Sequence, residues 1–241
     1  GILSETDEYV TVNGDSSWYG DIAQDDSTIS DPYYDFTVAA DCPDGHMINF
    51  TLEFCDINDS VFTSYPSYMV YAPVLTYQDL VIEGGNGDGI LDPGETCDLI
   101  ATLMNEGGGS ATNVTSTLLC SSSYITINDD TGNFGTILPD STATNDADPY
   151  NVTADSTTPM GTNIDFQLEV TADNYIDTFD LSVVVGKKHY YLWNPDPTPA
   201  PGQNMHQILG DLGYSGDYST SSLAGDLSMY QSVIVCVGIY S

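Results

Sequence analysis

An acidic, glycine-rich segment at residues 84–95 (GGNGDGILDPGE) has the residue types of a loop that binds a hard cation. Calcium takes about six to eight oxygen ligands, and carboxylates spaced a few residues apart can wrap one ion. Aligned on the calcium-loop pattern, the ligand positions fall on Asn86, Asp88, the backbone carbonyl of Ile90, Asp92 and Glu95. We therefore predict a calcium site in this segment.

The segment departs from the pattern at its first position. Gly84 stands where a carboxylate is expected, so Glu83 or a residue from elsewhere would have to supply that ligand. The alternative is an Asp/Gly turn between two strands with no ion. We favour calcium because carboxylates clustered this closely repel one another unless a cation lies among them.

The charge balance narrows the classes of partner. The chain has 36 acidic side chains and two basic ones, Lys187 and Lys188, which give a net charge of −34. Nucleic acids and anionic membrane surfaces need a basic footprint, so we expect binding to neither. No apolar run approaches the roughly 20 residues of a membrane helix, so no membrane insertion is expected. The acidic residues are 29 Asp and only seven Glu, a skew that indicates turns and calcium rather than helices.

Two of the five cysteines are placed for a disulfide bond. If residues 97–104 and 112–119 are neighbouring antiparallel strands, Cys97 has the inward parity of Leu99, and Cys120 has that of Leu118. Both thiols would then lie inside a sandwich at the same end, where a bond across the core is geometrically reasonable. Two buried free thiols are the alternative.

The other three cysteines are not expected to form disulfides within the chain. Cys42 and Cys55 would lie at opposite ends of one strand, too far apart to bond. Cys236 falls within an apolar run and is expected to be a packed, reduced thiol.

A catalytic function has little support in the sequence. His46, His189 and His206 are scattered, and none lies in a motif that pairs it with Cys or Ser. We therefore expect no enzymatic activity. Glycosylation is a separate prediction, since acceptor sequons occur at Asn49, Asn58, Asn113 and Asn151.

Residues 74–186 show the pattern of an antiparallel β-sandwich. Apolar and polar residues alternate, as from Phe166 to Val170, and the short runs are separated by Gly, Pro, Asn and Asp. Strands are predicted at 74–82, 97–104, 112–119, 124–127, 150–154, 164–171 and 178–185. Short strands at this spacing favour a sandwich.

Residues 1–73 repeat part of this pattern at an offset of 115 or 116 residues. The segment that starts at Tyr9 (YVTVN) recurs from Tyr124 (YITIN), and the segment that starts at Gly45 (GHMINFTLE) recurs from Gly161 (GTNIDFQLE). This is a tandem duplication. Aligned on the second copy, the first copy begins in the third strand, so an incomplete sandwich is expected.

The pattern changes after Gly186. An aromatic strand is predicted at 187–193, a proline-rich loop at 194–202 and a continuously apolar strand, buried on both faces, at 232–240. Between them a helix is predicted to end at Gly213 and to have one apolar face, made by Met205, Ile208, Leu209 and Leu212. This order is typical of the start of a parallel α/β domain.

The predicted fold class is thus mainly β: tandem antiparallel Ig-like β-sandwiches followed by the truncated start of an α/β domain. The predicted divisions are an incomplete first sandwich (1–73), a complete second sandwich with the calcium loop (74–186) and the start of an α/β module (187–241). Because both ends fall inside domains, the sequence is expected to be a window on a longer polypeptide.

Three segments carry a resemblance to a known family: 85–95, then 99–108 (LIATLMNEGG) and 111–114 (ATNV). They resemble the Ig-like repeats, related to adhesion-type CARDB modules, of very large secreted bacterial surface proteins. Some of those proteins also carry gingipain-like peptidase domains. The resemblance covers most of residues 1–186, and the opening at Tyr191 (YLWNPD) is similar to an α/β module that often follows such repeats. It implies a domain type and leaves the function open.

The leading hypothesis is a non-catalytic structural protein, extracellular or at the cell surface: a filament, fibre or stalk of calcium-stabilised repeats. Its partners would be other copies of itself, which supply in trans the strands that the first sandwich lacks, together with glycans. Completion by an upstream stretch of the same chain is the alternative. An accessory region of a secreted gingipain-like peptidase, or a carbohydrate- or protein-binding adhesin with exposed Tyr and Trp, are the competing functions.

Overall fold

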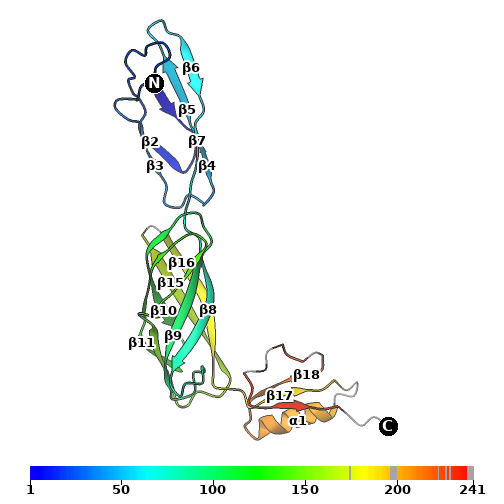
Figure 1. The fold of residues 1–241 in the computed structure, drawn as a ribbon. Coiled ribbons are helices and arrows are strands. Elements are labelled where there is room, and N and C mark those ends of the chain that lie inside the picture. Colours follow the sequence, from blue (N-terminus) through cyan, green and yellow to red (C-terminus); the bar gives the residue numbers. More distant parts are fainter. Residues whose placement is uncertain (174, 196–199, 222, 226, 228, 238–241) are drawn as a thin grey trace.

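The computed structural model describes residues 1–173, 175–195, 200–221, 223–225, 227 and 229–237. The protein is mainly β, and Figure 1 shows an elongated arrangement of three bodies in chain order. We call the body with β1–β7 repeat one (residues 1–73), the body with β8–β16 repeat two (74–186), and the remainder the C-terminal module. Within the described residues, no helix combines the length and the apolar character that a membrane span requires.

Repeat two is a sandwich of two antiparallel sheets. One sheet has the order β12-β10-β15-β16, and the other has the order β11-β14-β9-β13, with β8 along the opposite side of β9. The strands are β8 (Leu75–Gly84), β9 (Thr96–Asn105), β10 (Ala111–Cys120), β11 (Ile125–Asp129), β12 (Thr131–Ile137), β13 (Ser141–Thr144), β14 (Tyr150–Ala154), β15 (Thr162–Ala172) and β16 (Tyr175–Val185).

The two sheets close on one contiguous core because alternate residues of each strand are apolar. In β9, Leu99, Ala101 and Leu103 are fully buried, and in β15 Phe166 and Leu168 face them from the other sheet. The intervening residues of both strands face outward. Burial of these side chains is the main stabilising term of the sandwich.

All seven strands predicted for residues 74–186 are present, with ends that differ by three residues or fewer. The sequence pattern does not predict β12 and β13. In β12, Gly132 and Gly135 interrupt the alternation, and β13 consists of small residues that are as common in turns. The positions of both strands are set by pairing with neighbouring strands: β12 pairs with β10, and β13 pairs with β9.

Repeat one consists of three small sheets: β1-β5-β6, β2-β3 and β4-β7. Its core cluster is correspondingly small and is formed by Leu3, Val10, Ile48 and Phe50. The strands are β1 (Ile2–Ser4), β2 (Val10–Gly14), β3 (Asp35–Val38), β4 (Met47–Asn49), β5 (Thr51–Cys55), β6 (Val61–Ser64) and β7 (Ser67–Met69).

Strand pairing in repeat one reproduces that of repeat two at the sequence offset. Val10 lies opposite Val38 in β2-β3, and Ile125 lies opposite Ala154 in β11-β14, and each ladder has a register shift at the same place. Likewise, β1-β5 matches part of β10-β15, and β5-β6 with β4-β7 match β15-β16. The predicted duplication is confirmed in the register. Residues 1–73, all of which the structure describes, contain no counterpart of β8 or β9.

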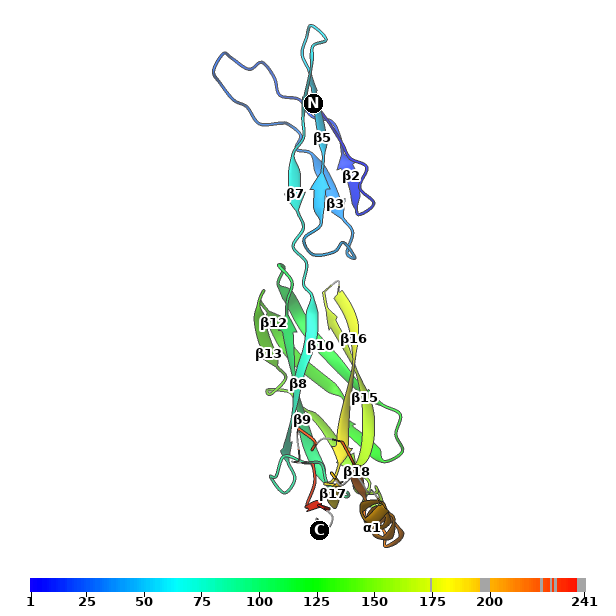
Figure 2. The ribbon, with the colours of Figure 1, turned by 90° about the vertical axis from the view of Figure 1, so that its right-hand side faces the viewer.

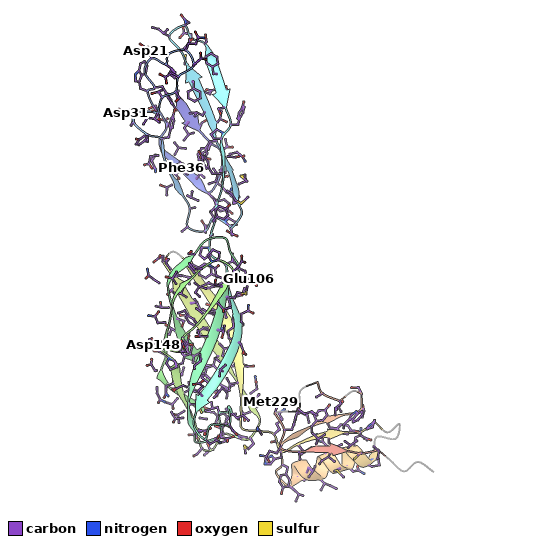
Figure 3. All side chains as sticks on the ribbon, in the orientation of Figure 1. Asp21, Asp31, Phe36, Glu106, Asp148 and Met229 are labelled. Atoms are coloured by element: carbon purple, nitrogen blue, oxygen red, sulfur yellow. The ribbon has the colours of Figure 1, made fainter. Side chains whose placement is uncertain are left out.

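Backbone packs directly against backbone at the inter-repeat joint, which we define as residues 71–74 and 105–109. Gly109 N donates a hydrogen bond to Ala72 O at 3.1 Å, and Glu106 N donates one to Val74 O at 2.8 Å. A Cβ atom on buried Gly107 would overlap Ala72 O, so only glycine permits this approach. Figure 3 labels Glu106 at the end of repeat two that faces repeat one.

One buried side chain, Asn105, satisfies several backbone groups at this joint. Its Oδ1 accepts from Val74 N and Gly107 N, both at 3.1 Å. Its Nδ2 donates to Gly109 O at 2.8 Å and to Ile137 O at 3.1 Å. Asn105 therefore ties the entry of repeat two to its β12 strand, with all its amide groups bonded.

The C-terminal module contains a parallel sheet of order β18-β17-β19, with α1 between β17 and β18 in the chain. The elements are β17 (Tyr190–Trp193), α1 (Ala200–Asp211), β18 (Gly216–Ser219) and β19 (Val233–Val235). The helix ends as predicted, since Gly213 has a φ of 87° and Tyr214 N bonds back to Leu209 O at 2.9 Å. The α/β expectation holds for this order of elements.

Two expectations for this module are wrong. Met205, Ile208 and Leu212 of the expected apolar face are exposed, because α1 contacts β17 and β18 through another residue, His206, whose ring lies against those of Tyr190 and Tyr218. Among the described residues, the strand expected at 232–240 is reduced to β19, which pairs with β17 and is partly exposed, so these residues are not buried on both faces. Residues 238–240 of that expectation lie outside the described residues.

Candidate metal centre

The segment predicted to bind calcium, which we call the acidic loop (residues 84–95), connects β8 to β9. Leu91 anchors the loop in the core of repeat two, where it is fully buried. Gly94 N donates to Ala154 O and Ala154 N donates to Glu95 O, both at 2.9 Å, which ties the loop to β14. The loop thus has a fixed path although most of its residues are exposed.

The backbone path of the acidic loop requires glycine. Positive φ angles, from 51° to 89°, occur at Gly84, Gly85, Gly87, Gly89 and Gly94. Residues with a side chain pay about 1–2 kcal/mol to enter this left-handed region, and a Cβ on Gly85 would also overlap the Glu95 carboxylate. The glycine spacing therefore bends the chain tightly around its carboxylates.

The acidic loop brings the five predicted ligand residues into one hydrogen-bonded network. The Glu95 carboxylate spans the loop, accepting from Asn86 N through Oε1 and from Asp92 N through Oε2, the latter at 3.0 Å. Asn86 Oδ1 accepts from Asp88 N at 2.9 Å, and its Nδ2 donates to Asp92 Oδ2 at 3.1 Å. Asp88 Oδ1 accepts from Ile90 N at 3.0 Å.

Electrostatic crowding in the loop is concentrated on Asp92. Burial raises the pKa of its carboxyl, and the negative charges of Asp88 and Glu95 raise this pKa further. A bound divalent cation would reverse this effect by favouring the ionised form of Asp92. A cation at this place would therefore offset the unfavourable charge environment of Asp92.

The exit of repeat two lies against the same loop. Gly186 N donates to Leu91 O at 2.8 Å, and the positive charge of Lys187 partly offsets the raised pKa of Asp92. The sequence does not predict that Gly186 and Lys187 lie near the acidic loop, because they are far from it in the chain. The available signal is that both basic residues of the chain directly follow the last strand of repeat two.

The carboxylates of the acidic loop are not arranged around one common position, as the ligands of an ion would be. Within the described part of the chain, no group of three or more His, Cys, Asp or Glu side chains has a metal-holding arrangement. Glu95, Asp88 and Asp92 are instead paired with N–H groups of the loop, so calcium would have to replace some of these bonds. Glu83 lies in β8 opposite Asp98, outside the network. Calcium binding stays a prediction.

No protein-family model matches this chain, and a comparison with curated proteins gives no match either.

Cys97 and Cys120 are both free thiols in the structure, so the predicted disulfide is not formed. The predicted parity is correct, since Cys97 belongs to the core of repeat two and Cys120 packs against it. Each thiol has another partner: Cys97 bonds to the Glu95 side chain, and Cys120 Sγ donates to Asp165 O at 3.5 Å. Burial, followed by the charge of Glu95, raises the pKa of Cys97 to about 12, so this thiol stays protonated at neutral pH.

The remaining thiols are also free. Cys42 is buried and Cys55 is exposed, and neither is bonded to the other. Cys236 is half-buried rather than fully packed. Burial raises the pKa of Cys42 above its ordinary value.

The four sequons differ in accessibility. Asn58 and Asn49 are exposed, and Asn58 lies between β5 and β6. Asn113 is exposed in β10, but its amide donates to Asp173 Oδ1 at 2.9 Å. Asn151 is half-buried in β14 and donates to Asp98 Oδ1 at 2.6 Å. The geometry favours Asn58 as a glycan acceptor, because it is exposed between two strands and its amide has only a long contact, 3.5 Å, to Asp56 Oδ2.

The three histidines lie in separate places. His46 Nε2 is 2.8 Å from Asp7 Oδ2 in repeat one. In the C-terminal module, His189 Nδ1 is 3.0 Å from Ser215 Oγ. His206 Nδ1 is 2.7 Å from Tyr190 OH. His189 Nδ1 also accepts a hydrogen bond from Ser215 N. These two residues directly precede β17 and β18, so the bond links the starts of the two strands.

Proposed function

We propose that this chain is part of a non-catalytic extracellular structural protein, in which calcium-stabilised Ig-like repeats form a surface stalk, fibre or filament. The observation that carries the proposal is the acidic loop, where Asp88, Asp92 and Glu95 crowd together beside the exit of repeat two. Calcium is abundant outside cells, and hard carboxylate oxygens are its preferred ligands.

Calcium at this place would stiffen the boundary between two bodies. The acidic loop is bonded to the core through Leu91, and Leu91 O is bonded to Gly186 at the start of the connection to the C-terminal module. An ion held by the loop would limit the motion of both. The tight inter-repeat joint at Gly107 supports the same role, because it restricts bending between the repeats.

Thermal unfolding with and without calcium tests the proposal. An ion bound only by the folded state at 100 times its dissociation constant adds about 2.7 kcal/mol. Chelation should lower the melting temperature of the wild type, and Asp88→Ala should remove this sensitivity. Asp180→Ala, which removes an exposed carboxylate from β16, is the matched control and should keep it. A melting temperature of the wild type that chelation leaves unchanged would refute calcium stabilisation.

A binding function is a second candidate, favoured by exposed aromatic side chains in repeat one. Trp18 and Tyr33 are 74% and 73% exposed and lie on strand-connecting segments joined by the Trp18–Asp31 bridge. Aromatic faces of this kind stack on sugars and anchor protein contacts. Binding to a glycan array, lost on Trp18→Ala, would support an adhesin over a pure spacer.

A further inference from the structure

The tripeptide Asn-Gly-Asp occurs twice in the chain, at residues 13–15 and 86–88. Asparagine followed by glycine is prone to lose its side-chain amide, because glycine has no side chain to hinder attack by its backbone nitrogen on the amide carbon. The first copy lies at the end of β2 in repeat one. The second lies in the acidic loop, which follows β8 at the far end of repeat two (Figure 2). The same local chemistry is therefore present in two different settings.

In the first copy, the side chain of Asn13 is held across to the neighbouring strand. Its Nδ2 donates to Thr37 Oγ1 at 2.9 Å and lies 3.5 Å from Asp35 Oδ2, both in β3. The next residue, Gly14, is paired opposite Asp35 in the β2–β3 ladder. Strand pairing thus holds both the amide and the following backbone nitrogen, and it opposes the change of backbone angles that ring closure between them requires.

In the acidic loop, the side chain of Asn86 folds back over the peptide unit that follows it. Asn86 Oδ1 accepts from Asp88 N at 2.9 Å, which closes an Asx turn around the Gly87 peptide unit. The same bond withdraws electron density from the amide carbon and makes it more electrophilic. The leaving nitrogen, Nδ2, donates to Asp92 Oδ2 at 3.1 Å, which holds the amide in this orientation.

One hydrogen bond in the loop opposes the reaction. Gly87 N donates to Gly84 O at 2.9 Å, and this bond must open before the nitrogen can lose its proton. Both residues are exposed and Gly87 lies outside the strands, so the opening requires only a local fluctuation. A Cβ atom on Gly87 would meet no atom within 4 Å beyond its chain neighbours, so the space around this residue is open.

We propose that Asn86 is a self-modification site, which the folded acidic loop converts to aspartate and isoaspartate in preference to Asn13. Gly87 N loses its proton to solvent and forms a bond to Asn86 Cγ. The bond from Cγ to Nδ2 then breaks, and the nitrogen takes up a proton and leaves as ammonia. Water adds to either carbonyl of the resulting succinimide ring and opens it. The net reaction is hydrolysis of the amide, and water is its only other reactant.

The products change both the charge and the path of the loop. Aspartate in place of Asn86 adds a carboxylate beside those of Asp88, Asp92 and Glu95, and it removes the amide that donates to Asp92 Oδ2. Isoaspartate inserts the side-chain Cβ into the backbone and so lengthens the segment before Gly87. The loop therefore becomes more negative with time. This inference goes beyond the proposed function and does not depend on a bound ion.

Peptide mapping by mass spectrometry tests the proposal. The folded chain is incubated with chelator at mildly alkaline pH, then unfolded and digested with a protease that cleaves after aromatic residues and leucine. Peptide 81–91 contains Asn86 as its only asparagine, and peptide 10–18 contains only Asn13, so each site is measured separately. Relative to the sample at time zero, peptide 81–91 should gain about one dalton, several times faster than peptide 10–18 does. Equal rates, or a faster rate at Asn13, would overturn the proposal.

Denaturant and two variants test whether the fold selects Asn86. In guanidinium chloride the two sites should react at similar rates, because they share one tripeptide, and a ratio as large as in the folded chain would contradict selection by the loop. Asn86→Gln should abolish the mass gain of peptide 81–91, since the larger ring forms much more slowly, whereas the matched control Asn13→Gln should leave that gain unchanged. A gain that persists in Asn86→Gln would overturn the assignment. Asn86→Asp provides the reference for the aspartate product.

Discussion

Repeats one and two share a sequence pattern and a strand register but differ in how well the same positions are buried. In repeat two, β9 lies between β8 and the β13/β14 side of its sheet, and the core is one large cluster. In repeat one, the equivalent strands hold a cluster of four buried residues. From this difference we infer that the duplicated strand pairs set the register. The presence of one central strand, β9 in repeat two, determines how much apolar surface is buried.

Matched truncation of one core position should separate the repeats most clearly. Phe166 and Phe50 occupy equivalent positions in β15 and the β4–β5 segment, and both are buried. Phe166→Ala should cost about 3–5 kcal/mol, because its closed surroundings leave a cavity. Phe50→Ala should cost less, because Phe36 and Tyr68 are free to collapse toward the gap.

Segment-resolved hydrogen exchange in urea is the suitable measurement for this pair. The two tryptophans, Trp18 and Trp193, lie outside repeat two and do not report on it. Equal losses for Phe166→Ala and Phe50→Ala would mean that repeat one is packed as tightly as repeat two, and would contradict the expected difference between the repeats.

The buried amide at the joint should show a somewhat smaller effect, confined to repeat two. Asn105→Ala leaves the N–H groups of Val74 and Gly107 and the carbonyls of Gly109 and Ile137 without their side-chain partner. We expect a loss of roughly 2–3 kcal/mol, because buried unpaired groups carry their full desolvation cost. Chemical unfolding measures it, and Asn128→Ala, at an exposed amide in β11, is the control. Similar losses for both would contradict the role of Asn105.

A glycine substitution at the joint should act on the arrangement of the repeats more than on their folding. Gly107→Ala places a Cβ against Ala72 O, and the linker must move to relieve the overlap. Overpacking of this kind costs about 1–3 kcal/mol. Small-angle scattering should show a changed envelope, and exchange should rise at residues 71–74. Ser110→Ala, next to the joint, should change neither.

Acid should distinguish the two repeats by a small effect at equivalent turns. Asp7 accepts from Tyr9 N at 3.0 Å, and Ser122 accepts from Tyr124 N at 3.2 Å at the same place in repeat two. The bond with His46, followed by the bond from Tyr9 N, lowers the pKa of Asp7 below 3.8. Its contribution is therefore present above that value and is lost as the pH falls through the lowered pKa, whereas the Ser122 turn has no such titration.

Amide exchange at Tyr9 and Tyr124 between pH 5 and pH 3 would measure this difference, after correction for the intrinsic pH dependence of exchange. Protection at Tyr9 should fall relative to Tyr124. The Asp7→Ser variant should make the two turns alike. An unchanged ratio in the wild type would show that the Asp7 bond does not stabilise the folded turn.

Long alternating strands could be predicted from the sequence because every second residue in them is apolar and buried. Short strands could not. The end of β13 depends on Asn145, whose buried Oδ1 accepts from Ala101 N at 2.8 Å and fills the ladder where β13 stops and β14 has not begun. The end of such a short strand is set by a neighbouring strand, so the local alternation of apolar and polar residues does not predict it.

The acidic loop could be predicted from Asp and Gly spacing, since both the oxygen ligands and the left-handed backbone are local properties. The partners that the fold brings to it could not. Lys187 and Gly186 reach the loop only after β16 has crossed the sandwich. The same limit applies to Cys97 and Cys120: parity places both thiols in the sandwich, but their distance and their other bonds depend on the packed ends of two sheets.

The adjacent Lys187 and Lys188 also decide how the chain meets proteases. A trypsin-like enzyme cleaves after Lys or Arg, and these are the only two such residues in the sequence. Lys188 forms an ion pair with Asp217, with Nζ at 3.0 Å from both carboxylate oxygens. Digestion by such an enzyme can cut this chain only at the boundary after repeat two. The two repeats would be released as one intact piece, with the inter-repeat joint and the acidic loop untouched.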